Sequence, residues 1–189
     1  MKKTNKFFAI LMLVILASPL LNSCKKGPDD PFISLRSRSG RLKGEWNLTS
    51  GTETGTEGTV TYTTTYNGTT ATVTYGGQAS SYAHTEDIQF LKGNAFTSTV
   101  LDNSQTTVCQ GFWAFMSGYD DIKNKECVVI RLSSETSGGS ITTYTGDDMP
   151  SYILRLDKLS GSELIVEANG STIGTSTNTS TSTKTYAKK

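Results

Sequence analysis

The sequence predicts an all-β protein, and three observations support this. Thr and Ser are abundant, with 30 Thr and 22 Ser in 189 residues, and β-branched Thr is favoured in strands and disfavoured inside helices. From Gly40 onward, apolar residues recur at every second position. Turn-forming residues interrupt this alternation at intervals typical of a sandwich or barrel of short antiparallel strands.

The first 23 residues are predicted to be a signal peptide. Lys2, Lys3 and Lys6 precede an uncharged apolar run over residues 7–21. This run is shorter than the ~20 residues that a membrane-spanning helix needs, and Pro19 interrupts it. A charged start followed by a short apolar core is typical of secretory signals.

The end of this segment, Leu21-Asn22-Ser23-Cys24, resembles the bacterial lipobox. The resemblance implies that the chain is cut before Cys24 and that this cysteine carries lipid. Three acyl chains make an effectively permanent membrane anchor. The alternative is an ordinary secretory signal followed by an unrelated cysteine.

Residues 24–40 are expected to be the lipidated cysteine and a tether, because they are charged and rich in turn formers. Lys25 stands where enterobacterial lipoproteins retained at the inner membrane carry Asp, so an outer-membrane location is expected, on either its periplasmic or its outer side. Removal of the signal peptide leaves 15 basic and 17 acidic residues. A net charge of −2 argues against nucleic acid as a partner.

Residues 41–189 are predicted to form a single β domain. A helical turn within residues 33–41 is expected before the first strand. The tail over residues 171–189 is either a closing strand or a disordered segment. The strands are predicted at about 42–49, 58–66, 69–76, 85–91, 95–101, 106–116, 126–133, 151–157, 163–168 and 179–186.

The hairpin around Asn67-Gly68 is the most specific local prediction. Asn-Gly favours a two-residue type I′ turn, which would pair Tyr66 with Thr69 and Tyr62 with Val73. One face of the hairpin then carries the Tyr, Val and Ala residues and the other face only Thr, so we expect the first face to point inward. The members of the inward face are Val60, Tyr62, Thr64, Tyr66, Thr69, Ala71, Val73 and Tyr75.

Three motifs resemble the lipocalins and the wider calycin group, which includes small bacterial lipoproteins. They are Gly44-x-Trp46 on the first strand, Gly111-Phe112-Trp113, and Leu164-x-Val166, and the resemblance covers about residues 40–170. It implies an antiparallel up-and-down β-barrel of about 8–10 strands with Trp46 closing one end; the alternative is that Trp46 is simply a core residue. Fatty-acid-binding relatives insert two helices after the first strand, where this chain has a Gly- and Thr-rich stretch over residues 50–58.

Cys109 and Cys127 are the two cysteines that remain after lipidation of Cys24. The expected compartment is oxidising, and the two residues lie on predicted strands joined by one loop, so we predict a disulfide between them. If Trp113 faces the interior beside Ile130, the two cysteines lie on opposite faces and cannot pair.

The sequence contains no motif that assembles an enzyme, and we predict a non-enzymatic protein without a cofactor or a metal. His84, the only histidine, lies near Glu86 and Asp87 and could form an acid–base pair. A loop histidine beside a strand start explains it more simply. The acidic pairs at 120–121 and 147–148 are explained as solvated loop charges.

The remaining expectation is a small apolar or amphipathic ligand inside the barrel. Inward-facing tyrosines and other large residues either fill a small barrel completely or line a pocket, and the sequence leaves both alternatives open. The second functional hypothesis is an interaction module of the cell envelope with a solid core, such as an adhesin, a hydrolase inhibitor or an accessory subunit. The residues expected to line a ligand site are Trp46, Val60, Tyr62, Val73, Tyr75 and Phe90.

Overall fold

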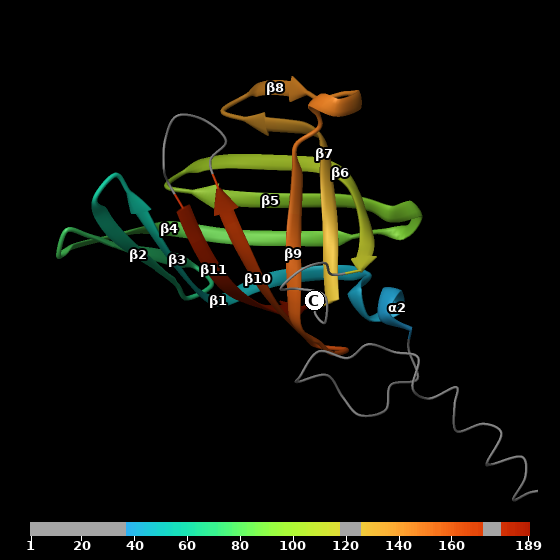
Figure 1. Cartoon of the computed structure of the whole chain (residues 1–189), viewed down its shortest axis with the longest axis horizontal. Helices are drawn as coiled ribbons and strands as arrows, with labels where there is room; N and C mark the ends of the chain where they lie inside the picture. The colour runs from blue at the N-terminus through green and yellow to red at the C-terminus, as the bar shows by residue number, and fades with distance from the viewer. Residues whose placement is uncertain (1–36, 118–125, 172–178) are drawn as a thin grey trace, which may run out of the picture.

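The computed structural model describes residues 37–117, 126–171 and 179–189 (Figure 1). A short helix, α2, precedes eleven antiparallel strands, and there are 3-10 turns over Lys92–Asn94 and Gly146–Asp148. The elements are α2 (Arg38–Leu42), β1 (Gly44–Glu57), β2 (Val60–Tyr66), β3 (Thr70–Tyr75), β4 (Gln78–Phe90), β5 (Ala95–Asp102), β6 (Gln105–Ser117), β7 (Glu126–Ser137), β8 (Ser140–Thr143), β9 (Ser151–Leu159), β10 (Glu163–Ser171) and β11 (Thr179–Lys188).

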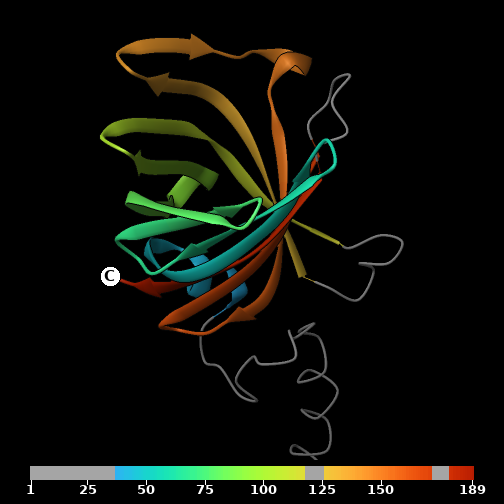
Figure 2. The ribbon, with the colours of Figure 1, turned by 90° about the vertical axis from the view of Figure 1, so that its left-hand side faces the viewer.

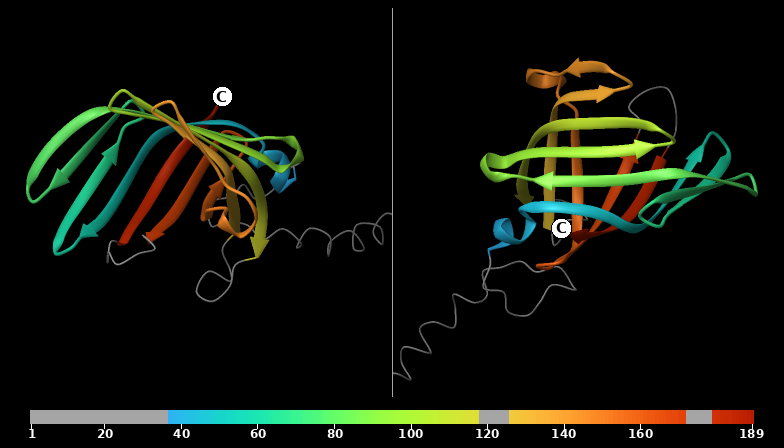
Figure 3. Two further views of the ribbon diagram at one scale, coloured as in Figure 1. Left: turned by 90° about the horizontal axis from the view of Figure 1, so that it is seen from above. Right: turned by 180° about the vertical axis from the view of Figure 1, so that it is seen from behind.

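Ten of the strands close into a barrel, in the order β6-β5-β4-β3-β2-β1-β11-β10-β9-β7, and β6 pairs with β7 to complete the ring. β8 is an additional strand that pairs only with the end of β7. This hairpin stands at the margin of the barrel (Figure 3). The predicted all-β, up-and-down antiparallel barrel is therefore confirmed.

The barrel has two unlike ends. At one end β1 pairs directly with β4, through Gly44–Asn47 and Asp87–Phe90. Farther along, the β2–β3 hairpin inserts between these two strands and pairs with both. The ring therefore widens from eight strands at the narrow end, beside α2, to ten strands at the wide end, which faces the viewer in Figure 2.

The Asn67-Gly68 turn sits at the point where β1 and β4 separate. Gly68 has a φ of 91°, and a Cβ there would lie 3.1 Å from the carbonyl oxygen of Leu48, so both conformation and space favour glycine. Asn67 pairs with Thr70, and its side chain accepts a hydrogen bond from the Thr70 backbone N–H at 2.9 Å.

The hairpin register is therefore shifted by two residues from the prediction, since Tyr66 lies opposite Ala71 and Tyr62 opposite Tyr75. A shift of two keeps every side chain on its predicted face. Thr64, Tyr66 and Ala71 are buried, which confirms the inward face near the turn. At the far end of the hairpin Tyr75 is 42% exposed.

All ten predicted strands are present, and the closing strand over the tail is confirmed as β11. Two segments that lie between the predicted strands, and were therefore expected to be loops, are in large part strand. The segment 77–84 belongs mostly to β4, because Gly76 and Gly77, both with positive φ, form the turn from β3 to β4. The segment 134–150 contains the end of β7 and all of β8, joined at Gly138-Gly139.

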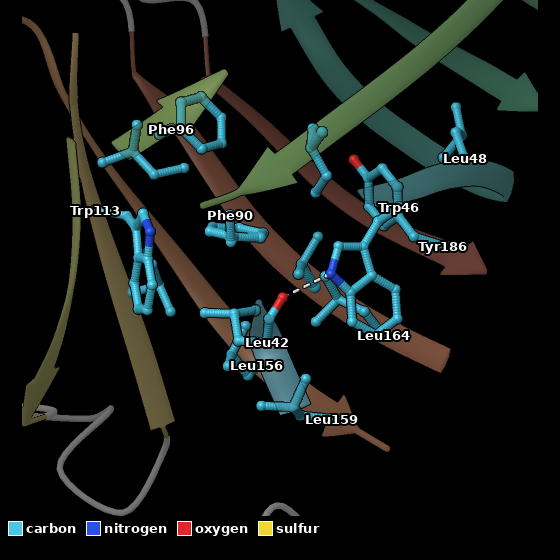
Figure 4. Close-up of a cluster of buried hydrophobic side chains, with 14 of the residues drawn as sticks. Leu42, Trp46, Leu48, Phe90, Phe96, Trp113, Leu156, Leu159, Leu164 and Tyr186 are labelled. Carbon is cyan, nitrogen blue, oxygen red and sulfur yellow. Dashed lines mark hydrogen bonds between the residues drawn. The ribbon is translucent and has the colours of Figure 1, made fainter. Parts of the chain in front are cut away.

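Large apolar side chains fill the narrow end (Figure 4). Trp46 is fully buried, and its indole Nε1 donates a hydrogen bond to the Leu42 carbonyl at the end of α2, at 2.8 Å. The Phe90 and Trp113 rings meet edge to face with centroids 5.7 Å apart. Trp46 is thus both a core residue and part of the closure under α2. The other buried apolar residues of this core include Leu42, Leu48, Phe96, Leu156, Leu159, Leu164 and Tyr186.

The predicted disulfide between Cys109 and Cys127 is wrong. Cys109 lies opposite Glu135 and Cys127 opposite Met116 on the same strand pair. Seven residues of β6 separate the two positions, or about 23 Å at ~3.3 Å per residue, whereas the Cα atoms of a disulfide lie within ~7 Å. Trp113 pairs with Ile130 and both are buried, which is the arrangement that separates the two thiols.

The predicted signal peptide, Cys24 and most of the tether lie outside the described residues. Among the residues that are described, no helix has the length and apolar character needed to cross a membrane. The predicted helical turn is present as α2, where the Ser37 hydroxyl caps the helix by accepting from the Gly40 N–H at 3.1 Å.

Candidate functional site

The interior of the wide end is polar, in contrast to the narrow end. The inward positions of β1, β2, β4, β5 and β11 bring together a set of charged and phenolic side chains, which we call the wide-end cluster. Its members are Glu53, Tyr62, Tyr66, His84, Glu86, Asp102, Lys184 and Tyr186.

Glu86 is the central acceptor of the cluster. Its carboxylate accepts a hydrogen bond from Lys184 Nζ at 2.5 Å and another from the Tyr186 hydroxyl at 2.7 Å. The Glu86 and Lys184 side chains are only 13% and 19% exposed. Lys184 Nζ also lies 5.0 Å from the centre of the Tyr66 ring, where a cation is attracted to the aromatic face.

His84 is buried in β4 between carboxylates on both sides. Its Nδ1 lies 2.8 Å from Asp102 Oδ1, and its ring stacks at a tilt on Tyr66 with centroids 4.7 Å apart. In the neutral imidazole this contact places the proton on Nδ1, so Nε2 is an acceptor. Nε2 has no hydrogen-bond partner and lies 4.0 Å from Glu86 Oε2.

Glu53 lies on the inward row of β1 between two glycines, Gly51 and Gly55. Its two carboxylate oxygens accept hydrogen bonds from the Tyr62 and Tyr66 hydroxyls, each at 3.1 Å. A Cβ at Gly55 would lie 2.5 Å from the Tyr62 ring, so the glycine leaves the space that this ring occupies. Gly51 likewise faces the Lys184 stem, whose Cγ would be 3.1 Å from a Cβ there.

The phenols of the cluster are held in their protonated form. Burial, and secondly the charge of Glu53, raises the pKa of both Tyr62 and Tyr66. Burial, followed by the charge and hydrogen bond of Glu86, raises the pKa of Tyr186 well above its ordinary value. These hydroxyl groups are therefore hydrogen-bond donors at neutral pH.

Filling the interior of a barrel with such polar and charged side chains costs free energy that apolar side chains would not cost. Charged side chains lose hydration on burial, and well-packed apolar residues of similar volume often stabilise a fold at least as well. His84 Nε2 is also left without a partner, which costs free energy in a buried position. Such a group of perturbed polar residues is a candidate binding site with a physical rationale.

One inward-facing side chain beside the open part of β9 remains accessible to solvent. Tyr152 faces inward beside buried Ile130, yet it is 52% exposed. The pairing of β9 with β10 ends at Arg155 and Glu167 in the described residues, so residues 151–154 of β9 have β7 but not β10 as a neighbour. Solvent thus reaches the interior of the barrel beside this part of β9.

The six residues predicted to line a ligand site are not brought together. Trp46 and Phe90 are fully buried in the narrow-end core. Tyr62 belongs to the wide-end cluster, and Val73 lies opposite Thr64 on the same hairpin. Val60 and Tyr75 lie toward the far end of that hairpin.

Three features of the cluster were not predicted from the sequence: Glu53, Lys184 and the contact of His84 with Asp102. His84 is a buried strand residue, 3% exposed, and not the loop residue that we expected. The Gly76-Gly77 pair could have revealed this, because a two-residue turn there extends the following strand through His84 with period-two alternation. Among the described residues, no group of three or more His, Cys, Asp and Glu side chains is arranged to hold a metal ion.

No protein-family model matches the chain, and neither a curated protein nor a solved structure shows significant similarity to it. The class of the protein therefore rests on its architecture: it is a closed, all-antiparallel β-barrel, compatible with a lipocalin-like fold.

Proposed function

We propose that this protein is a lipid-anchored, non-enzymatic β-barrel of the cell envelope that binds a small amphipathic molecule at its wide end. The observation that carries this proposal is the wide-end cluster, a set of polar groups inside an otherwise apolar barrel. Small-molecule sites combine apolar walls with a few converging polar groups that orient the ligand. The apolar part of the ligand would face the inward Val and Tyr side chains, and its polar group would meet the cluster.

The membrane anchor is the part of the proposal that rests on the sequence alone. The lipobox-like Leu21-Asn22-Ser23-Cys24 and the short apolar run before it support cleavage and lipidation at Cys24, and Lys25 after the cysteine supports an outer-membrane destination. Replacing Cys24 with Ser should move the protein from the membrane fraction to the soluble fraction. Metabolic labelling with a radioactive fatty acid provides the check, since the variant should carry no label. A variant that remains in the membrane and keeps its label would refute the anchor.

Binding at the wide end can be tested with the neutral fluorescent probe N-phenylnaphthylamine. Ala168 on β10 faces the interior, because it lies opposite Ser182, which in turn lies opposite Glu53. An Ala168→Trp change places a large side chain in the wide end, and we expect it to weaken probe binding at least tenfold, which corresponds to about 1.4 kcal/mol. Fluorescence titration of the purified protein measures the effect.

The matched control is Asn169→Trp, on the opposite face of the same strand, where the Asn169 side chain is exposed and accepts from Arg155. This variant should bind the probe as the unmodified protein does. Failure of the unmodified protein to bind the probe, or equal loss in both variants, would count against a site inside the wide end.

A second candidate function is an interaction module of the envelope. The observation that favours it is the β7–β8 hairpin, where Ile141 is 71% exposed on a strand that pairs along one edge only within the described part of the chain. Exposed apolar residues beside a free strand edge are typical of surfaces that pair with another chain. An Ile141→Asp variant that abolishes a pull-down from the native envelope, together with absence of probe binding, would support this second function instead.

A further inference from the structure

The charges of the wide-end cluster do not balance. Lys184 and His84 are its two basic side chains, and the charge of Lys184 is matched by Glu86 at 2.5 Å. Asp102 faces His84. Glu53 is left with two neutral phenol donors, and no basic side chain of the described residues lies within 4.0 Å of it.

An inward carboxylate of this kind attracts a cation. Glu53 is half-buried, and a carboxylate that loses part of its hydration is stabilised by an opposite charge beside it, whereas phenol donors supply hydrogen bonds but no charge. The Tyr62 and Tyr66 rings stand beside Glu53, and aromatic faces attract organic cations. Tyr82, inward on β4, extends the same aromatic surface, because it lies opposite Ala71, which itself lies opposite Tyr66.

A second and independent observation is the unpartnered Nε2 of His84. This atom and Glu86 Oε2 are both acceptors when the imidazole is neutral, and they face each other at 4.0 Å. A donor at an ordinary hydrogen-bond distance of about 2.8–2.9 Å from Nε2 would satisfy that atom, whereas Glu86 Oε2 already accepts from Lys184 Nζ at 2.5 Å. An ammonium group has several N–H donors and a positive charge, so it suits the position beside Glu53, and Tyr66 contacts both Glu53 and His84.

We infer that the wide-end cluster binds the ammonium group of a small organic cation, with Glu53 as its counter-ion and the tyrosine rings as its walls. This inference rests on the proposed function and specifies the ligand class. The cluster carries more carboxylates than cations, so it favours an amine over a carboxylate of the same shape.

The test compares three probes of matched shape: phenethylammonium, phenethyl alcohol and hydrocinnamate. Calorimetric titration of the unmodified protein at neutral pH should give the highest affinity for phenethylammonium. The alcohol should bind at least tenfold more weakly and hydrocinnamate more weakly still. Glu53→Gln should lower the affinity for phenethylammonium at least tenfold and change that for the alcohol by less than twofold.

Glu45→Gln is the control, because Glu45 lies on the outward face of the same strand at the narrow end and its side chain is 50% exposed; its affinities should be those of the unmodified protein. Circular dichroism reports whether Glu53→Gln is folded. Should it not fold, Tyr62→Phe provides the alternative test, because it keeps the ring, removes one donor from Glu53 and should retain the preference for phenethylammonium over hydrocinnamate.

The outcomes separate the two proposals. Equal or tighter binding of hydrocinnamate, or unchanged phenethylammonium binding by folded Glu53→Gln, overturns the cation site and leaves small-molecule binding in place. Loss of the amine preference in Tyr62→Phe overturns it as well. If neither these three probes nor N-phenylnaphthylamine binds the unmodified protein, the proposed function itself fails.

Discussion

Replacing Trp46 with Ala is expected to lower the free energy of unfolding by about 3–5 kcal/mol, the range for large aromatic residues removed from a core. Trp46 is fully buried between β1 and α2, and it donates its indole N–H to the Leu42 carbonyl at 2.8 Å. The change would leave a cavity at the narrow end and remove one of the contacts that hold α2 on the barrel, beside that of Lys188 Nζ with the Arg41 carbonyl. Urea denaturation followed by circular dichroism measures the loss.

Two further variants, one conservative and one at an exposed position, serve as comparisons for this prediction. Trp46→Phe keeps an apolar ring but leaves the Leu42 carbonyl without its indole donor, and it should cost roughly 1–3 kcal/mol. Phe112→Ala removes an aromatic side chain that is mostly exposed, and it should change stability by less than about 0.5 kcal/mol. A Trp46→Ala protein within 1 kcal/mol of the original, on the scale of a single weak interaction, would show that the narrow end is not packed as described.

Replacing Glu86 with Leu is expected to destabilise the fold by about 3–5 kcal/mol, because it leaves one charge of a largely buried pair without its partner. Lys184 Nζ and the Tyr186 hydroxyl both donate to Glu86. Removing the Lys184 charge as well should recover much of the loss, so the double variant Glu86→Leu, Lys184→Met should be more stable than Glu86→Leu alone. Chemical denaturation of Glu86→Leu, of Lys184→Met and of the double variant measures the coupling free energy between the two residues in a double-mutant cycle.

Asp87 supplies a control beside Glu86 on the opposite face of β4. It contacts Lys189 at 3.5 Å, with both side chains well exposed. Exposed pairs contribute little to stability, so Asp87→Asn should have an effect below about 1 kcal/mol. Additive losses in the Glu86 and Lys184 variants would mean that these two residues are not coupled.

The barrel could be predicted from the sequence because two signals indicate its strands. Apolar and polar residues alternate along each strand, and turn-forming residues mark where one strand ends and the next begins. At the Asn67-Gly68 hairpin, the Thr-only face and the mixed Tyr and Val face already determine which side is inward. The two-residue shift came from tertiary contacts, because Gly68 must fit against the Leu48 carbonyl and Asn67 closes the turn on Thr70. Neither contact can be inferred from the local turn preferences of the sequence.

The wide-end cluster could not be predicted in the same way. On β1 the inward row is Gly51, Glu53 and Gly55, and the outward row between them is Thr52 and Thr54. Neither row is apolar, so hydropathy gives no signal of which one faces the interior. The Gly- and Thr-rich stretch over residues 50–58 is thus mostly part of β1, the strand that carries Glu53.

The partners of the cluster are also distant in sequence. Lys184 meets Glu86 across 98 positions, and His84 meets Asp102 only because β4 and β5 pair in that register. The predicted disulfide failed for a related reason. The two cysteines lie near opposite ends of one strand pair, and their separation depends on where the β6–β7 connection begins, which composition does not define.

A crystal structure of the protein grown with phenethylammonium tests most directly whether the wide end of the barrel is a binding site. The expected result is the ammonium nitrogen within hydrogen-bond distance of the Glu53 carboxylate, with the phenyl ring among the inward side chains of the wide end. Ligand density confined to the outer surface, or Glu53 bound only to the Tyr62 and Tyr66 hydroxyls at saturating ligand, would contradict the site.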